Sequence, residues 1–273
     1  MLNIPQITLN NGVKIPQLGL GVFQAAQGRE TYTAVRNALE VGYRHLDTAT
    51  IYRNEEDVGR ALRDSGVPRE DVFVTTKLWN ADQGATTARA AFESSLRRLG
   101  LEYLDLFLLH WPVPAKRLES WQVLESLLAE GRVRAIGVSN FMQRHLDELL
   151  AHCTVTPQVN QIELSPFLQQ REVQAVCAAR GIRLEAYSPL TKAQRLNHPV
   201  VVSIAQSLAR SPAQVLLRWS IQHEFVVLPK SVRKERIAEN AALFDFVLDE
   251  LMMRQLDALE EGLVTGWDPR TAP

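Results

Sequence analysis

Short runs of apolar residues recur along the chain about every 30 residues, which is the length of a strand–helix–strand unit. The eight runs lie at residues 18–21, 45–47, 73–76, 106–109, 135–138, 159–162, 184–186 and 226–228. Within them apolar residues follow one another, as in 106–109, rather than alternating with polar residues. Such continuous runs are typical of strands buried on both faces, as in a parallel sheet covered by helices.

The segments between the runs carry helical patterns. Ahead of the fourth run, apolar residues spaced by three and four positions fall on one helix face: Ala88, Ala91, Phe92, Leu96 and Leu99. Gly100 predicts the end of this helix. A second helix is predicted over residues 119–130, with Gly131 placed to adopt the left-handed conformation that ends many helices.

Eight alternating units predict an α/β fold, the (β/α)8 or TIM barrel. A doubly wound sheet is the alternative, but it usually has a glycine-rich dinucleotide turn after its first strand. Residues 18–23 lack the third glycine of that turn, and no helix pattern begins there. In front of the barrel, residues 7–9 and 13–15 alternate around Asn11-Gly12, which predicts an N-terminal β-hairpin with a tight turn. We expect a single domain over residues 1–273.

The charge balance excludes several classes of partner. The 273 residues include 30 Lys and Arg against 31 Asp and Glu, so the formal net charge is -1. No overall field attracts nucleic acid or an anionic membrane. Cys153 and Cys177 form no metal-ligand motif, and no apolar run reaches the roughly 18 residues of a membrane helix. We therefore expect a soluble, cytoplasmic protein.

Polar residues follow the apolar runs, at the end of the barrel where enzymes of this fold place their active sites. Asp47, Lys77 and His110 end the second, third and fourth runs, and Tyr52 lies in the loop after Asp47. A lysine favours the anionic form of a neighbour, so Tyr52 is a candidate acid with a pKa that Lys77 lowers.

Each residue alone has a simpler explanation: Asp47 caps a helix, Lys77 forms a salt bridge, and His110 is a core histidine. A metal centre is a further alternative, but metal-dependent barrels usually supply several histidines and carboxylates. The chain has no His-x-His pair, so we expect no metal. The joint position of the four residues favours an acid–base set.

A second cluster lies at residues 228–240. It contains four basic and two acidic residues and spans a predicted strand end and the start of a predicted helix. A helix N-terminus with Lys and Arg can bind phosphate, and a solvated basic helix face is the alternative. The position favours phosphate, because the last loops of these barrels commonly hold one.

With these motifs in place, the chain resembles the aldo-keto reductase family from the hairpin to about residue 240. The matching segments are GYRHLDTATIYRNE at 42–55, TTKLW at 75–79, LDLFLLHWP at 104–112, GVSNF at 137–141, NQIE at 160–163, YSPL at 187–190, and the run 229–240. Within the family it is most similar to the compact prokaryotic branch of 2,5-diketo-gluconate reductases.

The resemblance implies a monomeric oxidoreductase that transfers hydride from NADPH to aldehydes or ketones. The implied catalytic residues are Asp47, Tyr52, Lys77 and His110, with Tyr52 as the general acid and His110 orienting the carbonyl. The implied cofactor residues are Gly21, Val22, Asp47, Ser139, Asn140, Gln161, Tyr187, Ser188, Leu190, Lys230, Ser231, Val232, Arg236, Glu239 and Asn240. Lys230 and Arg236 would meet the 2′-phosphate that distinguishes NADPH from NADH.

Phe23, Trp79 and Trp111 are implied as apolar substrate walls, beside Tyr52 and His110. Two departures stand out. Thr191 replaces a glycine found in many relatives in the loop over the pyrophosphate, and the tail beyond residue 259 is short. We expect an open pocket with a broad substrate range. The alternative function is an NADPH-binding sensor or regulatory subunit with slow turnover on the same scaffold.

Overall fold

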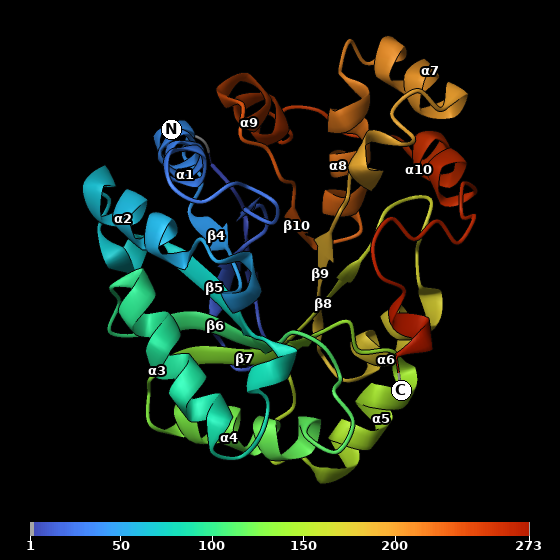
Figure 1. Ribbon diagram of the computed structural model, residues 1–273. Coiled ribbons are helices and arrows are strands. Elements are labelled where there is room, and N and C mark those ends of the chain that lie inside the picture. The colour runs from blue at the N-terminus through green and yellow to red at the C-terminus, as the bar shows by residue number, and fades with distance from the viewer. Residues whose placement is uncertain (1–2, 273) are drawn as a thin grey trace.

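Eight parallel strands form the centre of the molecule. The computed structural model describes residues 3–272; residues 1, 2 and 273, which end the predicted domain range, lie outside the described residues. The strands follow one another around the ring in chain order (Figure 1): β3 (Leu20–Gly21), β4 (His45–Asp47), β5 (Phe73–Leu78), β6 (Leu104–Leu109), β7 (Val133–Ser139), β8 (Val159–Glu163), β9 (Arg183–Tyr187) and β10 (Val226–Leu228).

The ring closes between its first and last strands. Parallel bridges join Leu18 to Val227 and Gly21 to Lys230, and Gly19 N donates to Val227 O at 2.9 Å. All eight predicted strand positions are confirmed, and so is the (β/α)8 barrel. The doubly wound alternative is wrong, because an open sheet leaves its edge strands unpaired.

Helices cover the outside of the ring (Figure 1). They are α1 (Arg29–Val41), α2 (Glu55–Ser65), α3 (Thr87–Leu99), α4 (Arg117–Ala129), α5 (Gln143–His152), α6 (Arg171–Ala179), α7 (Pro199–Ser207), α8 (Pro212–Gln222), α9 (Lys234–Ala241) and α10 (Glu250–Asp257). Short 3-10 turns are η1 (Thr50–Tyr52), η2 (Arg69–Asp71), η3 (Asn80–Asp82), η4 (Thr191–Ala193) and η5 (Pro269–Thr271). Both predicted helices are confirmed within two residues, and Gly100 and Gly131 end them with φ of 67° and 71°.

The predicted N-terminal hairpin is present as β1 (Gln6–Thr8) and β2 (Lys14–Pro16), but its turn differs from the prediction. Leu9 N donates to Val13 O, and Gly12 N donates to Leu9 O, so residues 10–12 form a three-residue loop. Only Gly12 takes a positive φ, of 86°, as in a type I turn followed by a left-handed residue. Leu9 and Ile15 of the hairpin pack against apolar side chains at the N-terminal end of the barrel interior.

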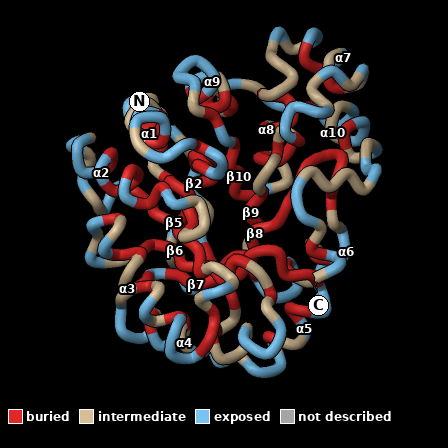
Figure 2. Tube along the Cα trace, viewed as in Figure 1, coloured by how far each residue is buried: buried red, intermediate tan, exposed pale blue. Residues whose placement is uncertain are grey.

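Burial is highest along the strands and decreases outward over the helices (Figure 2). The interior changes character along the barrel axis. The layer toward the N-terminal strand ends is apolar and includes Phe73, Leu106 and Val159. Buried polar side chains gather toward the C-terminal strand ends. Within residues 3–272, no single helix is long and apolar enough to cross a membrane; one bent pair, α7 and α8 at 90°, passes that test by length and composition.

Candidate active site

The four predicted acid–base residues lie at neighbouring strand ends. Asp47 is the last residue of β4, Lys77 lies near the end of β5, His110 follows β6, and Tyr52 ends η1. Because β4, β5 and β6 are adjacent in the sheet, their ends meet at one sector of the rim. The structure thus brings together residues that are up to 63 positions apart in the sequence.

Lys77 is the centre of this group. Its ammonium nitrogen Nζ donates to Asp47 Oδ1 at 2.6 Å and to the carbonyl oxygen of Thr48 at 2.9 Å. The same nitrogen lies 3.5 Å from the hydroxyl of Tyr52. The Lys77 side chain is fully buried, so its charge acts in a low-dielectric environment where electrostatic interactions are strong.

Burial and charge act in opposite directions on Lys77 and Tyr52. Burial disfavours the ammonium form, but Asp47, Tyr52 and Glu185 together outweigh it and raise the pKa of Lys77. Burial also raises the pKa of Tyr52, and Lys77 only partly offsets this effect. Lys77 therefore acts on Tyr52 in the predicted direction, but the net shift in pKa is upward, contrary to our expectation.

His110 is held neutral beside Tyr52. Burial, assisted by the charge on Lys77, lowers the pKa of His110 well below its usual value. The imidazole lies edge-on to Tyr52 and to Trp79, with ring centroids 5.8 and 5.3 Å away. Within the described chain, its buried Nδ1 has no hydrogen-bond partner. A neutral imidazole retains one N–H donor for a polar ligand.

Next to this group, four of the predicted cofactor residues form a hydrogen-bonded cluster. Tyr187 donates its hydroxyl proton to Asn140 Oδ1 at 2.7 Å, and Asn140 Nδ2 donates to the His110 carbonyl at 3.0 Å. Ser139 Oγ donates to the Gln161 carbonyl at 2.9 Å. Asn140 adopts a left-handed backbone with φ of 64°.

The segment after β3 lies on the other side of Tyr52. Gly21 and Val22 are buried, and Val22 N donates to the Asp47 carbonyl at 3.1 Å. Phe23 is 48% exposed, and its ring centroid lies 5.0 Å from that of Tyr52. Phe23 therefore lies at the mouth of the site, and its role as a substrate wall stays a prediction.

The sequence analysis missed one aromatic residue at this mouth. Trp267 in the C-terminal segment lies 6.5 Å from Trp79 and 6.0 Å from Trp111 between ring centroids, yet 72% of it is exposed. A single tryptophan in the C-terminal segment is a weak signal, but it was the available one. The C-terminal segment thus adds an aromatic ring beside Trp79 and Trp111.

Hydrogen bonds hold this tail against the barrel. Glu163, at the end of β8, accepts from the backbone N–H and the hydroxyl of Thr265. Lys192 Nζ donates to the Thr265 carbonyl at 2.6 Å, and Arg195 Nε donates to Glu261 at 2.7 Å. The loop after β9 and the C-terminal segment are thus connected at two points.

That loop, residues 188–193, has an unusual backbone. Ser188, Thr191, Lys192 and Ala193 all have φ between 48° and 66°. Leu190 lies among them and is half-buried. Left-handed conformations cost side-chain-bearing residues about 1–2 kcal/mol, which glycine avoids. The hydroxyl oxygen of Thr191 accepts from Arg195 N at 3.2 Å.

The basic cluster lies where β10 ends and α9 begins. Lys230 Nζ lies 3.4 Å from the Gln24 carbonyl, and Arg236 is exposed in the first turn of α9. Among residues 3–272, no carboxylate lies within ion-pair distance of either side chain. Lys234, in contrast, is bound to Glu40 of α1 at 2.9 Å.

The remaining residues of this predicted site follow the same segment. Ser231 is buried, its hydroxyl accepts from Arg233 N at 3.2 Å, and Val232 is half-buried beside it. Asn240 lies four residues after Arg236 and therefore on the same helix face, with Glu239 next to it.

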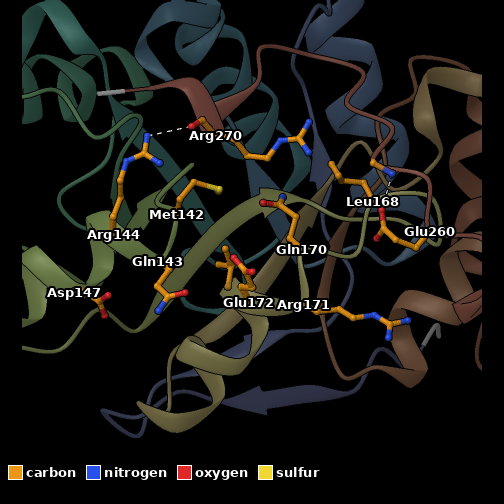
Figure 3. A pocket seen from close by; sticks show the side chains of 12 residues that line it. Met142, Gln143, Arg144, Asp147, Leu168, Gln170, Arg171, Glu172, Glu260 and Arg270 are labelled. Carbon is orange, nitrogen blue, oxygen red and sulfur yellow. Dashed lines mark hydrogen bonds between the residues drawn. The ribbon is translucent and has the colours of Figure 1, made fainter.

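A separate cavity of about 790 Å³ lies between α5, α6 and the C-terminal segment (Figure 3). It contains none of the four acid–base residues. Three arginines and three carboxylates line it, so the charges cancel: Arg144, Arg171, Arg270, Asp147, Glu172 and Glu260. Arg144 donates to the Arg270 carbonyl across its edge. No group of three or more His, Cys, Asp or Glu suited to a metal occurs in the described residues.

A closed (β/α)8 barrel with acid–base residues at its C-terminal rim is the architecture of a barrel enzyme. Comparison with known proteins gives the family. The model of the Aldo/keto reductase family matches residues 17–261. The chain is 52% identical to the 9,11-endoperoxide prostaglandin H2 reductase of Trypanosoma cruzi, over 96% of this chain and 94% of that protein.

Glyoxal reductase of Bacillus subtilis is 49% identical over 96% of this chain and 95% of its own length. The solved structure of the silkworm aldo-keto reductase AKR2E5 complexed with NADPH has a TM-score of 0.92 at 34% identity, covering 98% of this chain and 91% of that one. The chain belongs to the aldo/keto reductase family, as the sequence motifs predict. It is accordingly an oxidoreductase of a family that acts on small-molecule carbonyl compounds with a nicotinamide cofactor.

Proposed function

We propose that this protein reduces aldehydes and ketones to alcohols with NADPH, using Tyr52 as the general acid. The observation that carries the proposal is the buried ammonium group of Lys77, which lies 2.6 Å from Asp47 and 3.5 Å from the Tyr52 hydroxyl. A fully buried lysine in contact with a tyrosine hydroxyl at a strand end is typical of a site that transfers protons.

Proton donation is the step that this chain's own side chains perform. The reduced nicotinamide, when bound, supplies the hydride. Tyr52 donates its phenolic proton to the carbonyl oxygen, and Lys77 stabilises the resulting tyrosinate. Asp47 keeps Lys77 charged and in place. His110, which is neutral, donates a hydrogen bond that orients the carbonyl oxygen toward Tyr52.

The residues at the rim fit a nicotinamide dinucleotide. Both N–H groups of Gln161 Nε2 are used on Asp47 and Glu185, which leaves its Oε1 to accept from a carboxamide. Lys230 and Arg236 lack carboxylate partners in residues 3–272, so a doubly charged 2′-phosphate would compensate them. The NADPH in the silkworm relative supports the same cofactor here.

Arg236→Ala is expected to raise the KM for NADPH by about tenfold or more, the equivalent of one charge-assisted hydrogen bond. The KM for NADH should change much less, because NADH has no 2′-phosphate. Steady-state kinetics with each cofactor measures both values. Lys234→Ala is the matched control, since Lys234 is bound to Glu40 and should leave both KM values unchanged. Equal effects of Arg236→Ala on NADPH and NADH would contradict the phosphate role.

We propose aromatic and other apolar carbonyl compounds as the preferred substrates. The mouth of the site is framed by Phe23, Trp79, Trp111 and Trp267, which offer ring faces rather than charges. Because Phe23 and Trp267 are both substantially exposed, the pocket is open enough to accept substrates of different sizes.

Trp267→Ala should raise the KM for an aromatic aldehyde by about two- to tenfold, the value of one aromatic contact. The KM for a small dicarbonyl such as glyoxal should change less, because it does not reach the tail. Leu251→Ala, which shortens an exposed apolar residue of α10, is the control for a surface change. A uniform effect on both substrates would argue against a contact at the mouth.

The function itself is tested by NADPH consumption with a panel of carbonyl compounds, run in parallel with NADH. Turnover with several aldehydes at the rates of ordinary enzymes supports a reductase, and tight NADPH binding with negligible turnover indicates the sensor alternative. We propose further that the active unit is a single-domain monomer. Strands from both ends of the chain complete one ring, which supports the single domain.

A further inference from the structure

A second carboxyl group lies behind the acid–base residues. Glu185 on β9 is fully buried and pairs in register with Gln161 on β8. The side-chain amide of Gln161 donates to Asp47 Oδ2 at 2.9 Å and to Glu185 Oε2 at 2.6 Å. One amide group therefore bridges the carboxyl that holds Lys77 and a carboxyl deeper in the barrel.

The remaining neighbour of Glu185 provides no countercharge. His45 Nε2 lies 3.6 Å from Glu185 Oε1, within the range of an ion pair. Burial, however, lowers the pKa of His45 to about 3, so its imidazole is neutral near pH 7. The ring is tightly packed, since a Cβ on Gly19 would lie 2.7 Å from its Nδ1. His45 instead contacts the Thr75 hydroxyl at 3.1 Å.

The charges that act on Glu185 come from three directions. β4 contributes Asp47 and the neutral His45, β5 contributes Lys77, and η1 contributes Tyr52. β10 pairs with Glu185 through Val226, and β8 contributes the uncharged Gln161. Within the described residues, Lys77 is thus the one cation that acts on these two buried carboxyl groups. Ionising two neighbouring carboxyl groups in a buried site has a high free-energy cost, so one of them retains a proton.

The contacts identify which carboxyl retains it. Asp47 is bound directly by Lys77, whereas Glu185 reaches that lysine only through Gln161 and Asp47. Burial, together with the charge on Asp47, raises the pKa of Glu185 to about 8. Glu185 is therefore neutral near pH 7 and ionises at mildly alkaline pH.

We propose that Glu185 is a positioning residue of the reductase: its protonated carboxyl keeps the charge around Lys77 and Tyr52 suited to proton donation, and its ionisation at alkaline pH weakens Tyr52 as an acid. This inference rests on the proposed function. The direction follows from electrostatics, because a new anion behind Asp47 favours the protonated form of Tyr52. A tyrosine that holds its proton more tightly donates it less readily.

The test uses Glu185→Gln in the full chain. The amide oxygen still accepts from Gln161, but no charge forms at any pH. For alcohol oxidation with NADP+, which needs the tyrosinate, the rising limb of the kcat/KM profile should move to lower pH by about half a unit, equal to about threefold in rate. For reduction of an aromatic aldehyde, which needs protonated Tyr52, the falling limb of the profile should move to lower pH in the variant by the same amount. Profiles that superimpose on the wild type would overturn the proposal.

The control is Glu55→Gln. Glu55 is also a buried carboxyl, but it pairs with Arg98 and Thr76 on the outside of the ring. Its loss should lower stability and leave the pH profile in place. Glu185→Leu provides a second variant, which should shift the profile in the same direction as Glu185→Gln.

A measurement without turnover separates this proposal from the proposed function. Ultraviolet difference titration of tyrosinate, with a Tyr52→Phe protein subtracted, reports the pKa of Tyr52 directly. That pKa should be lower in Glu185→Gln than in the wild type, even if no carbonyl compound is reduced. An unchanged pKa of Tyr52 would overturn the role of Glu185, whatever the activity.

Discussion

Replacing Tyr52 by phenylalanine is expected to lower kcat for carbonyl reduction by about 10²–10⁴-fold, the usual contribution of a general acid. Besides Asp47 and Thr48, Lys77 Nζ contacts this hydroxyl, at 3.5 Å. Its removal leaves the ring in contact with Phe23 and His110, so the shape of the pocket is retained. NADPH binding, measured by fluorescence titration, should change little.

Tyr103→Phe is the matched control for this change. The Tyr103 ring lies under Arg69, with 4.1 Å between the guanidinium carbon and the ring centroid, and phenylalanine keeps that contact. Its activity should equal that of the wild type. Full activity of Tyr52→Phe would exclude Tyr52 as the proton donor and with it the acid–base assignment.

Lys77→Met should have the largest effect on stability. The substitution leaves the Asp47 carboxylate buried without its cation, and breaking a buried pair in this way costs about 3–5 kcal/mol of unfolding free energy. Activity should also be lost, because no charge remains to stabilise a tyrosinate. Urea unfolding, followed by circular dichroism, measures the first effect and NADPH consumption the second.

Two further variants allow that result to be interpreted. Lys234→Met breaks an exposed pair with Glu40 and should reduce stability far less. Asp47→Asn combined with Lys77→Met removes both charges and should recover part of the lost stability without restoring activity. If the double substitution is as unstable as the sum of the two single ones, the loss arises from packing rather than from the unpaired carboxylate.

The strands and the acid–base residues could be predicted because each depends on local sequence. Residues 106–109 are apolar on both faces of a strand, and His110 follows at once, so a pattern and a position in the fold were sufficient to place this residue. The turn of the hairpin was predicted incorrectly, since Asn11-Gly12 suits a two-residue turn as well as the observed loop.

Trp267 and Glu185 could not be predicted, for two different physical reasons. Trp267 is placed by contacts distant in sequence, such as that of Thr265 with Glu163 about 100 residues earlier in the chain, and no local pattern encodes them. Glu185 lies within a strand predicted from its apolar neighbours. Its role depends on a side chain of the adjacent strand, Gln161, and on the charges of Asp47 on β4 and Lys77 on β5, neither of which neighbours β9 in the ring.

The connection between Lys192 and Thr265 has a consequence for how the family diversifies. A tail that changes to accommodate a new substrate also changes the support of the loop after β9, because the two segments share this hydrogen bond and the Arg195–Glu261 pair. We therefore expect a change in the tail to affect cofactor retention as well as substrate choice. Exchanging the tail between relatives should transfer the intended specificity cleanly only when residues 188–195 are exchanged with it.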